Sequence, residues 1–188
     1  QILSQEELQR FLIQAESEGF YEMFLLELST GMRRGELCGL RWDDLNFRTG
    51  ELRIERQVNT VRGELLEMPP KTKGSSRTVI LPPGVVEVLR EYKQRVDSRW
   101  MFPSPVKEDA PREPCAVGKR LRIILERADC KHVRFHDLRH TFATMALEHG
   151  MDVKTLSTVI GHVSAATTLD IYSHVTDKMQ MQAAVNID

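Results

Sequence analysis

The chain has 188 residues, 41% hydrophobic and 28% charged, so we expect one well-buried globular domain rather than a disordered segment. Its formal net charge of -1 lacks the global positive excess that would by itself indicate a nucleic-acid-binding protein. No apolar run reaches the roughly 18 to 20 residues that a membrane-spanning helix needs, and the first residues are not a signal peptide. We therefore expect a cytoplasmic protein with no membrane partner.

The first part of the chain predicts helices. Residues 4–15 begin with a Ser-x-x-Glu capping box, and apolar residues then follow at helical spacing. Residues 20–28 are almost entirely apolar, which predicts a buried helix that ends near Gly31. Helical character resumes at Arg33.

In the middle of the chain, the spacing of the apolar residues changes from helical to alternating. Three short segments, at residues 51–58, 63–69 and 76–82, alternate apolar with polar residues and are bounded by Gly, Pro and Asn. They predict a small three-stranded antiparallel sheet. The connection at residues 69–76 is polar, basic and flexible in character.

The rest of the chain reads as helical, apart from a Pro-rich loop at residues 102–114. The predicted helices span residues 84–94, 116–128, 136–148, 153–160 and 165–173. A weakly amphipathic tail covers residues 176–188. The predicted fold class is therefore α+β, mainly α, with the small sheet set among helices.

The local charge and the spacing of the cysteines indicate which kinds of site this chain can form. Residues 112–139 carry eight Lys or Arg against four Asp or Glu, so this part of the chain is locally basic. Cys38, Cys115 and Cys130 are far apart and form no C-x-x-C pattern, and we interpret them as reduced core thiols of a cytosolic protein.

The segment "RFHDLRHTFAT", residues 134–144, holds the densest group of chemically capable side chains. His136 and His140 share a helix face, as in zinc proteases. However, Asp137 stands where such a motif needs Glu, and Arg139 lies between the two histidines. The segment alone leaves three interpretations open: a metal site, a phosphate site, or a solvated charged helix face.

Other segments carry single candidates. Arg33 and Arg34 open a helix, where free N–H groups and guanidinium forks favour anions. Lys71 lies between two predicted strands, His162 follows the predicted helix at residues 153–160, and Tyr172 lies in the predicted helix at residues 165–173. Alone, each is explained more simply by a charged helix start, a solvent-facing Lys or a core Tyr.

The combination of motifs resembles the tyrosine recombinase family, also called phage-type integrases. "TGMRRGEL", "KTKGSSR", "HDLRH", "IGH" and "LDIY" occur in the family's order, and the resemblance extends from Leu3 to Tyr172. It implies the helical fold of DNA breaking-rejoining enzymes and transesterification of DNA through a 3′-phosphotyrosyl intermediate, with no metal, ATP or other cofactor. "MRRGEL" and "PKTKGSSRTV" are most similar to integrases of phages and conjugative transposons, which integrate and excise mobile elements.

The resemblance carries the family's roles onto the matching positions. The implied catalytic residues are Arg33, Lys71, His136, Arg139, His162 and Tyr172. Tyr172 is the implied nucleophile and Lys71 the implied general acid, with Lys73 as the alternative acid. Glu36 is expected to orient Arg33 or a histidine without contacting the DNA itself. The expected DNA contacts are Arg34, Lys73, Arg77, Lys119, Arg120, Arg134 and His140.

The resemblance also implies an assembly. Residues 1–175 would form the catalytic domain, and residues 176–188 would dock on a neighbouring subunit of a homotetramer on double-stranded DNA. We expect N-terminal DNA-binding domains to be absent from this chain and a directionality factor to be a further partner in the bacterial cytoplasm. The alternatives are a type IB topoisomerase-like enzyme, a non-catalytic DNA-binding protein with a helix-turn-helix around residues 153–160, and a zinc enzyme using His136 and His140.

Overall fold

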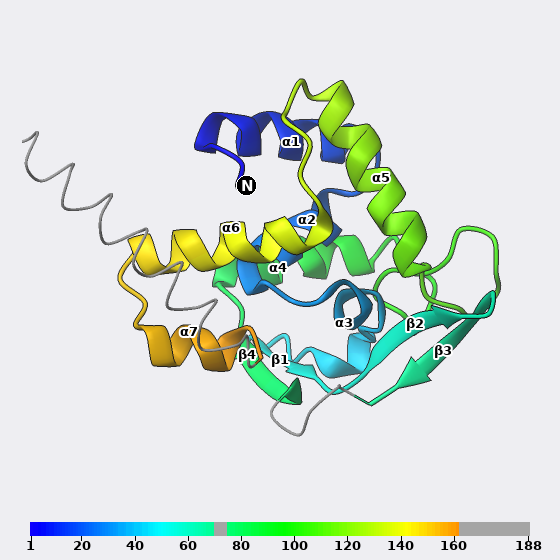
Figure 1. The fold of residues 1–188 in the computed structure, drawn as a ribbon. Coiled ribbons are helices and arrows are strands. Elements are labelled where there is room, and N and C mark those ends of the chain that lie inside the picture. Colours follow the sequence, from blue (N-terminus) through cyan, green and yellow to red (C-terminus); the bar gives the residue numbers. More distant parts are fainter. Residues whose placement is uncertain (70–74, 162–188) are drawn as a thin grey trace, which may run out of the picture.

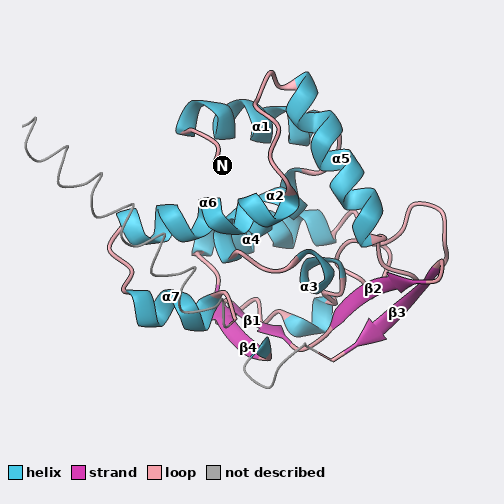
Figure 2. Ribbon diagram, viewed as in Figure 1, coloured by secondary structure: helices cyan, strands magenta, loops and turns pink. Residues whose placement is uncertain are grey.

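A computed structural model describes residues 1–69 and 75–161 of the chain. These residues form seven α-helices, one short 3₁₀ helix and four β-strands (Figures 1 and 2). The helices are α1 (Gln5–Ser17), α2 (Tyr21–Thr30), α3 (Arg34–Cys38), α4 (Pro83–Lys93), α5 (Pro114–Arg127), α6 (Phe135–Glu148), α7 (Val153–Val159) and the 3₁₀ helix η1 (Trp42–Asp44). The strands are β1 (Glu51–Ile54), β2 (Gln57–Val61), β3 (Glu64–Met68) and β4 (Arg77–Ile80).

The predicted N-terminal helices are confirmed. The Ser4 side chain accepts a hydrogen bond from the Glu7 amide (3.1 Å), which completes the capping box of α1. α2 is buried and ends at Gly31, which adopts a left-handed conformation (φ 66°). A Cβ atom at Gly31 would lie 2.5 Å from Phe142 and 2.9 Å from Ile160. Only glycine lets the end of α2 approach α6 and the end of α7 this closely.

The antiparallel sheet predicted in the middle of the chain is divided in the structure. Instead of three strands in one sheet, β1 pairs with β4, and β2 pairs with β3 as a hairpin. The expected first strand, residues 51–58, is interrupted at Glu55 and Arg56. Arg56 donates to both carboxylate oxygens of Asp44 (2.5 and 3.2 Å) and to the Gly39 carbonyl (3.1 Å). These bonds pull the backbone between β1 and β2 toward η1.

The buried hydrophobic residues form two clusters, and the smaller one fixes the position of α7. The larger one joins α1, α2, α4, α5, the beginning of α6 and the strands. The smaller one joins α6 to α7 through Phe142, Leu147, Leu156 and Ile160. α7 therefore lies beside α6, with β4 against it (Figure 1). This packing brings the C-terminal end of α7 close to the beginnings of α3 and β4.

Several predicted features lie outside the described residues. They are Lys71, Lys73, His162, Tyr172, the helix at residues 165–173 and the tail at residues 176–188. Among the residues that the structure does describe, none of the helices is both long and apolar enough to cross a membrane.

Candidate phosphate-binding site

Three arginines from separate parts of the chain donate to three consecutive backbone carbonyls at the end of α7. Arg77 Nε donates to Val159 O (2.7 Å), and Arg139 Nη2 donates to Ile160 O (3.0 Å). Arg33 Nη2 donates to Gly161 O (2.8 Å). The last carbonyls of a helix have no partner within the helix and carry the negative end of its dipole, so cations are favoured there. The three guanidinium groups therefore converge around one backbone segment.

Arg33 is placed by the start of α3. It is the N-cap residue, with an extended backbone, and its amide donates to Glu36 Oε1 (2.9 Å). Its side-chain Nη1 lies 3.7 Å from Glu36 Oε2, and Glu36 itself is only 1% exposed. A Glu three residues into a helix satisfies the free amide at the helix start. The same carboxylate thus holds both the backbone and the side chain of Arg33.

Arg139 points inward from α6 and is almost completely buried. Burial, together with the nearby charge of Arg33, lowers the pKa of Arg139 to about 10, so the guanidinium stays protonated at neutral pH. Arg139 Nε and Arg33 Nη1 are buried and have no hydrogen-bond partner among the described residues. Arg33 Nη1 has only the long ion pair with Glu36 (3.7 Å), whereas Arg139 Nε has no hydrogen-bond partner among these residues. A buried donor without a partner is costly unless a ligand accepts from it, and a phosphate group offers several acceptor oxygens.

His136 and His140 lie on the same side of α6, with ring centroids 4.9 Å apart in an edge-to-face arrangement. Burial lowers the pKa of His136, and the charges of Arg139 and His140 lower it further. Burial also lowers the pKa of His140. Both imidazoles are therefore mostly neutral at pH 7, and a neutral imidazole is able to accept a proton.

Glu27 is an acidic residue of this region that the sequence reasoning did not identify. It belongs to α2, is 0% exposed, and neither carboxylate oxygen has a hydrogen-bond partner among the described residues. Burial raises the pKa of Glu27 well above its ordinary value, while the charge of Arg139 opposes this shift. The available signal was a Glu inside the nearly apolar run "YEMFLLELST".

The residues expected to contact DNA occupy different surroundings. Arg134 is exposed at the start of α6 (77% of the side chain), and Lys119 is exposed on α5. Arg34 lies against Gly118 of α5. Arg120 pairs with Glu18 (3.4 Å), the residue that follows α1, and its guanidinium lies over the Phe20 ring.

Arg77 is placed differently from the expected surface contact. Its side chain is only 4% exposed, and its nitrogens donate to Glu36, Ser75 and Val159. The sequence spacing indicated the position of this arginine but not the direction in which its side chain points.

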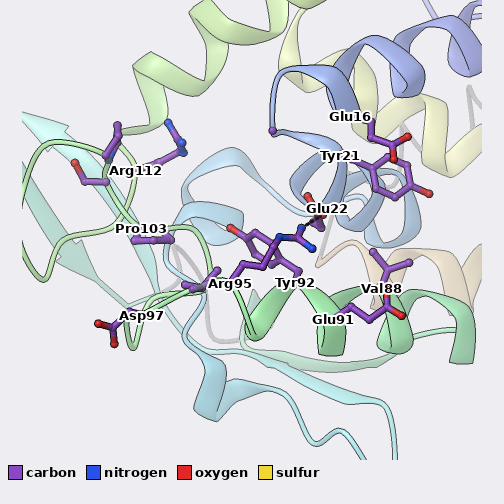
Figure 3. Close-up of a pocket in the computed structure, with 14 residues that line it drawn as sticks. Glu16, Tyr21, Glu22, Val88, Glu91, Tyr92, Arg95, Asp97, Pro103 and Arg112 are labelled. Carbon is purple, nitrogen blue, oxygen red and sulfur yellow. Dashed lines mark hydrogen bonds and ion pairs between the residues drawn. The ribbon is translucent and has the colours of Figure 1, made fainter.

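A large pocket elsewhere in the molecule has the wrong chemistry for phosphate. It has a volume of about 600 Å³ and lies between the start of α2 and the end of α4 (Figure 3). Four acidic residues line it against two arginines, of which Arg95 is paired with Glu22 (2.7 Å). None of the site residues expected from the sequence lines this pocket. The arginine cluster, not the cavity, is therefore the candidate site.

Among residues 1–69 and 75–161, no group of three or more His, Cys, Asp or Glu side chains is arranged to hold a metal ion. The predicted helix face with His136 and His140 exists, and Arg139 lies one turn from His136 on the same helix. Within the described part of the chain, this face joins the arginine cluster rather than a set of acidic ligands.

Two converging arginines, the buried Arg139 and the partly exposed Arg33, are supported by the buried Glu36 in a mainly helical domain, and this arrangement defines a class of oxyanion-binding site. The chain belongs to the phage integrase family, whose profile matches residues 1–179. It is 30% identical to a tyrosine recombinase XerC-like protein of Caldanaerobacter subterraneus subsp. tengcongensis, over 98% of this chain and 53% of that protein. It is 34% identical to the tyrosine recombinase XerA of Pyrococcus furiosus, over 85% of this chain and 51% of that protein. The chain spans about half the length of these curated relatives.

Solved structures agree on the fold. The integrase of transposon Tn1549, determined in complex with a circular intermediate DNA, matches 97% of this chain with a TM-score of 0.81 and 22% identity, over 65% of that chain. The XerA recombinase crystal structure matches 97% of this chain with a TM-score of 0.77 and 27% identity, also over 65% of that chain. The predicted fold class, mainly helical with small antiparallel strand pairings, is confirmed.

Proposed function

We propose that this chain is the catalytic domain of a site-specific DNA recombinase that integrates and excises a mobile element. The observation that carries the proposal is the convergence of Arg33 and Arg139 at the end of α7, where the buried Arg139 Nε has no hydrogen-bond partner among the described residues and Arg33 Nη1 has only a long ion pair with Glu36 (3.7 Å). Membership of the phage integrase family and the motif order support the same conclusion. The reaction is transesterification of DNA through a 3′-phosphotyrosyl intermediate.

The two arginines would bind the non-bridging oxygens of the scissile phosphate. Negative charge gathers on these oxygens as the tyrosine attacks phosphorus, and guanidinium forks match them with two hydrogen bonds each. Donors fixed in a site with little water stabilise such charge strongly, and loss of one costs about 3 kcal/mol or more. His162, which follows Gly161 directly in the sequence, is proposed as a further donor.

Proton transfer would use the remaining residues. A phenol has an ordinary pKa of about 10, so Tyr172 needs a neighbour that accepts its proton when it attacks. Neutral His136 is the proposed acceptor. Lys71, or Lys73 in its place, would protonate the 5′-oxygen that leaves.

The proposal assigns no metal, nucleotide or other cofactor to the reaction. The charge that a metal would supply comes from the arginines, and the phosphotyrosyl bond conserves the energy needed to reseal the strand. The chain contains no G-x-x-x-x-G-K-[ST] motif for nucleotide phosphates.

The proposed partner is double-stranded DNA, held mainly through its phosphates. Exposed basic residues such as Arg134, at the start of α6, are suited to this, and binding should weaken steeply with salt. As proposals from the family, we retain a homotetramer on DNA, docking of residues 176–188 on a neighbouring subunit, a directionality factor and a cytoplasmic location. Arg34, Lys119, Arg120 and His140 remain proposed DNA contacts, and Lys73 is a proposed contact if Lys71 is the general acid.

The test compares wild type with Tyr172→Phe on duplex DNA that carries candidate ends of the element, with EDTA present and ATP absent. We expect strand cleavage and joining by wild type and neither by the variant. Cleavage that requires added Mg²⁺ or Zn²⁺, or that persists in the variant, would overturn the proposal. Relaxation of supercoiled DNA without recombination of paired sites would instead identify a topoisomerase-like enzyme.

A further inference from the structure

The buried Arg77 links two parts of the candidate site. Its Nη1 and Nη2 donate to the two oxygens of Glu36 (2.8 and 3.1 Å), and its Nε donates to Val159 O (2.7 Å). Nη1 also donates to Ser75 O (2.7 Å). Every nitrogen of this guanidinium therefore already donates within the protein. An arginine held in this way, with 4% of its side chain exposed, is not free to bind DNA phosphate.

Gly161 shows how closely Arg77 is packed against the end of α7. A Cβ atom at Gly161 would lie 2.6 Å from Arg77 Nη1 and 2.8 Å from Arg77 Cζ. Gly161 also has a left-handed backbone (φ 74°), which side chains disfavour. The Gly161 carbonyl accepts from Arg33 Nη2 (2.8 Å). Gly161 is thus held by Arg33 while the guanidinium of Arg77 packs against it.

Glu36 completes the connection. It accepts from the Arg33 amide and, through both oxygens, from Arg77. One carboxylate that is 1% exposed therefore bonds the start of α3 and the start of β4. Because Arg77 also bonds the last turn of α7, the three elements are joined by charged hydrogen bonds in a buried environment, where such bonds are strong and strict in geometry.

We propose that Arg77 is a positioning residue: it fixes Arg33, through Glu36, relative to the end of α7 and so holds the phosphate-binding arginines in register. The proposal deepens the proposed function and rests on it for its effect on catalysis. Its effect on the end of α7 follows from the contacts alone. A lysine at this position keeps the charge but cannot bond both Glu36 oxygens and Val159 O at once.

The experiment compares Arg77→Lys with Arg53→Lys. Arg53 lies on β1, the strand paired with β4, and its side chain is 54% exposed, so it is a matched control on the neighbouring strand. At saturating duplex DNA, we expect Arg77→Lys to lower the rate of covalent adduct formation by roughly a hundredfold, the loss typical of a misplaced reacting group. The Kd for DNA and its salt dependence should match those of wild type and of Arg53→Lys.

Hydrogen exchange of the free protein supplies a readout that does not depend on activity. Arg77→Lys should speed amide exchange in peptides covering residues 156–161 and leave α1 unchanged, whereas Arg53→Lys should change neither. Exchange that is unchanged at the end of α7 would overturn the positioning role. A weaker Kd with a reduced salt slope would also overturn it, because that result identifies Arg77 as a direct phosphate contact.

The two proposals fail in different ways. If wild type forms no adduct while Arg77→Lys still loosens the end of α7, the proposed function fails and the structural link stands. If wild type forms the adduct and Arg77→Lys forms it at the same rate, the link has no role in catalysis and the inference fails alone. Gly161→Ala would disturb the contact between Arg77 and the end of α7 from the other side, because its Cβ would clash with Arg77 Nη1. This variant should also bind DNA normally and form the adduct slowly.

Discussion

Arg33 and Arg139 donate to adjacent carbonyls, those of Gly161 and Ile160, although one precedes α3 and the other lies inside α6. Two like charges brought together in a largely buried place repel each other, and the pKa of Arg139 is lowered in part for that reason. Glu36 and the end of the α7 dipole offset this repulsion. Both arginines are therefore held in place by bonds within the protein.

Replacing Arg139 by Lys tests the clamp directly. Lys keeps the charge but loses the planar fork, so the rate of adduct formation at saturating DNA should fall by about a hundredfold or more. Arg53→Lys, on β1 with 54% of its side chain exposed and no assigned role in the site, is the control and should leave that rate unchanged. Equal rates for the two variants would argue against two-point binding of phosphate by Arg139.

The rate of adduct formation should depend on pH through His136. Its pKa is lowered by burial, then by Arg139 and His140, and the proposed proton acceptor is the neutral form. The rate should therefore fall on acidification, with a midpoint below the ordinary histidine value of about 6.5. His136→Gln should be slow at every pH and lack this acidic limb. A midpoint above that ordinary value in wild type would contradict the assignment.

The buried carboxyl of Glu27 makes a prediction for stability. Its pKa in the folded state is raised by burial, so the folded protein keeps a proton that the unfolded chain releases above about pH 4.3. The free energy of unfolding of wild type should therefore fall, by at most about 1.4 kcal/mol per pH unit from this group, as pH rises toward the folded-state pKa. Glu27→Gln should lack this contribution.

Urea unfolding of wild type and Glu27→Gln across this range measures the difference. The variant should gain stability relative to wild type as the pH increases. A difference that does not change with pH, or that changes in the opposite direction, would show that Glu27 is ionised and well paired in the folded protein.

Gly31 should tolerate substitution poorly. Gly31→Ala forces a left-handed backbone on alanine and places its Cβ 2.5 Å from Phe142. We expect a loss of roughly 1 to 3 kcal/mol of stability, measured by thermal or urea unfolding. Gly84→Ala is the control, because it lies in α4 with nothing within 4 Å of the new Cβ and should be neutral or stabilising. Equal losses in the two variants would refute this explanation.

The sequence predicted the helices well because their signals are local. The capping box at Ser4 and the glycine that ends α2 act within a few residues, and both appear where expected. The interruption at Arg56 depends on Asp44 and Gly39, which are remote in the sequence, so alternation alone predicted one continuous strand. Patterns of neighbouring residues cannot predict that a strand is interrupted by an ion pair, here between Arg56 and Asp44, with a residue outside the strand.

The candidate site was predictable in part for a related reason. Motif order identified Arg33, Glu36, His136 and Arg139, and the structure brings these side chains into one region. Motif order did not distinguish a surface arginine from Arg77, which is buried by contacts with α3 and α7. It also gave Glu27 no role, since the burial of an acid depends on how α2 packs against α6.

The most direct test of the account is to identify the residue that becomes linked to DNA. The chain has three tyrosines, and two of them, Tyr21 and Tyr92, line the acidic pocket away from the arginine cluster. Burial raises the pKa of Tyr92 to about 12, which disfavours attack by that residue. After reaction with a suicide duplex and proteolysis, mass spectrometry should find the nucleotide adduct on the peptide containing Tyr172. An adduct on Tyr21 or Tyr92, or cleavage of the duplex without an adduct on any tyrosine, would contradict the account.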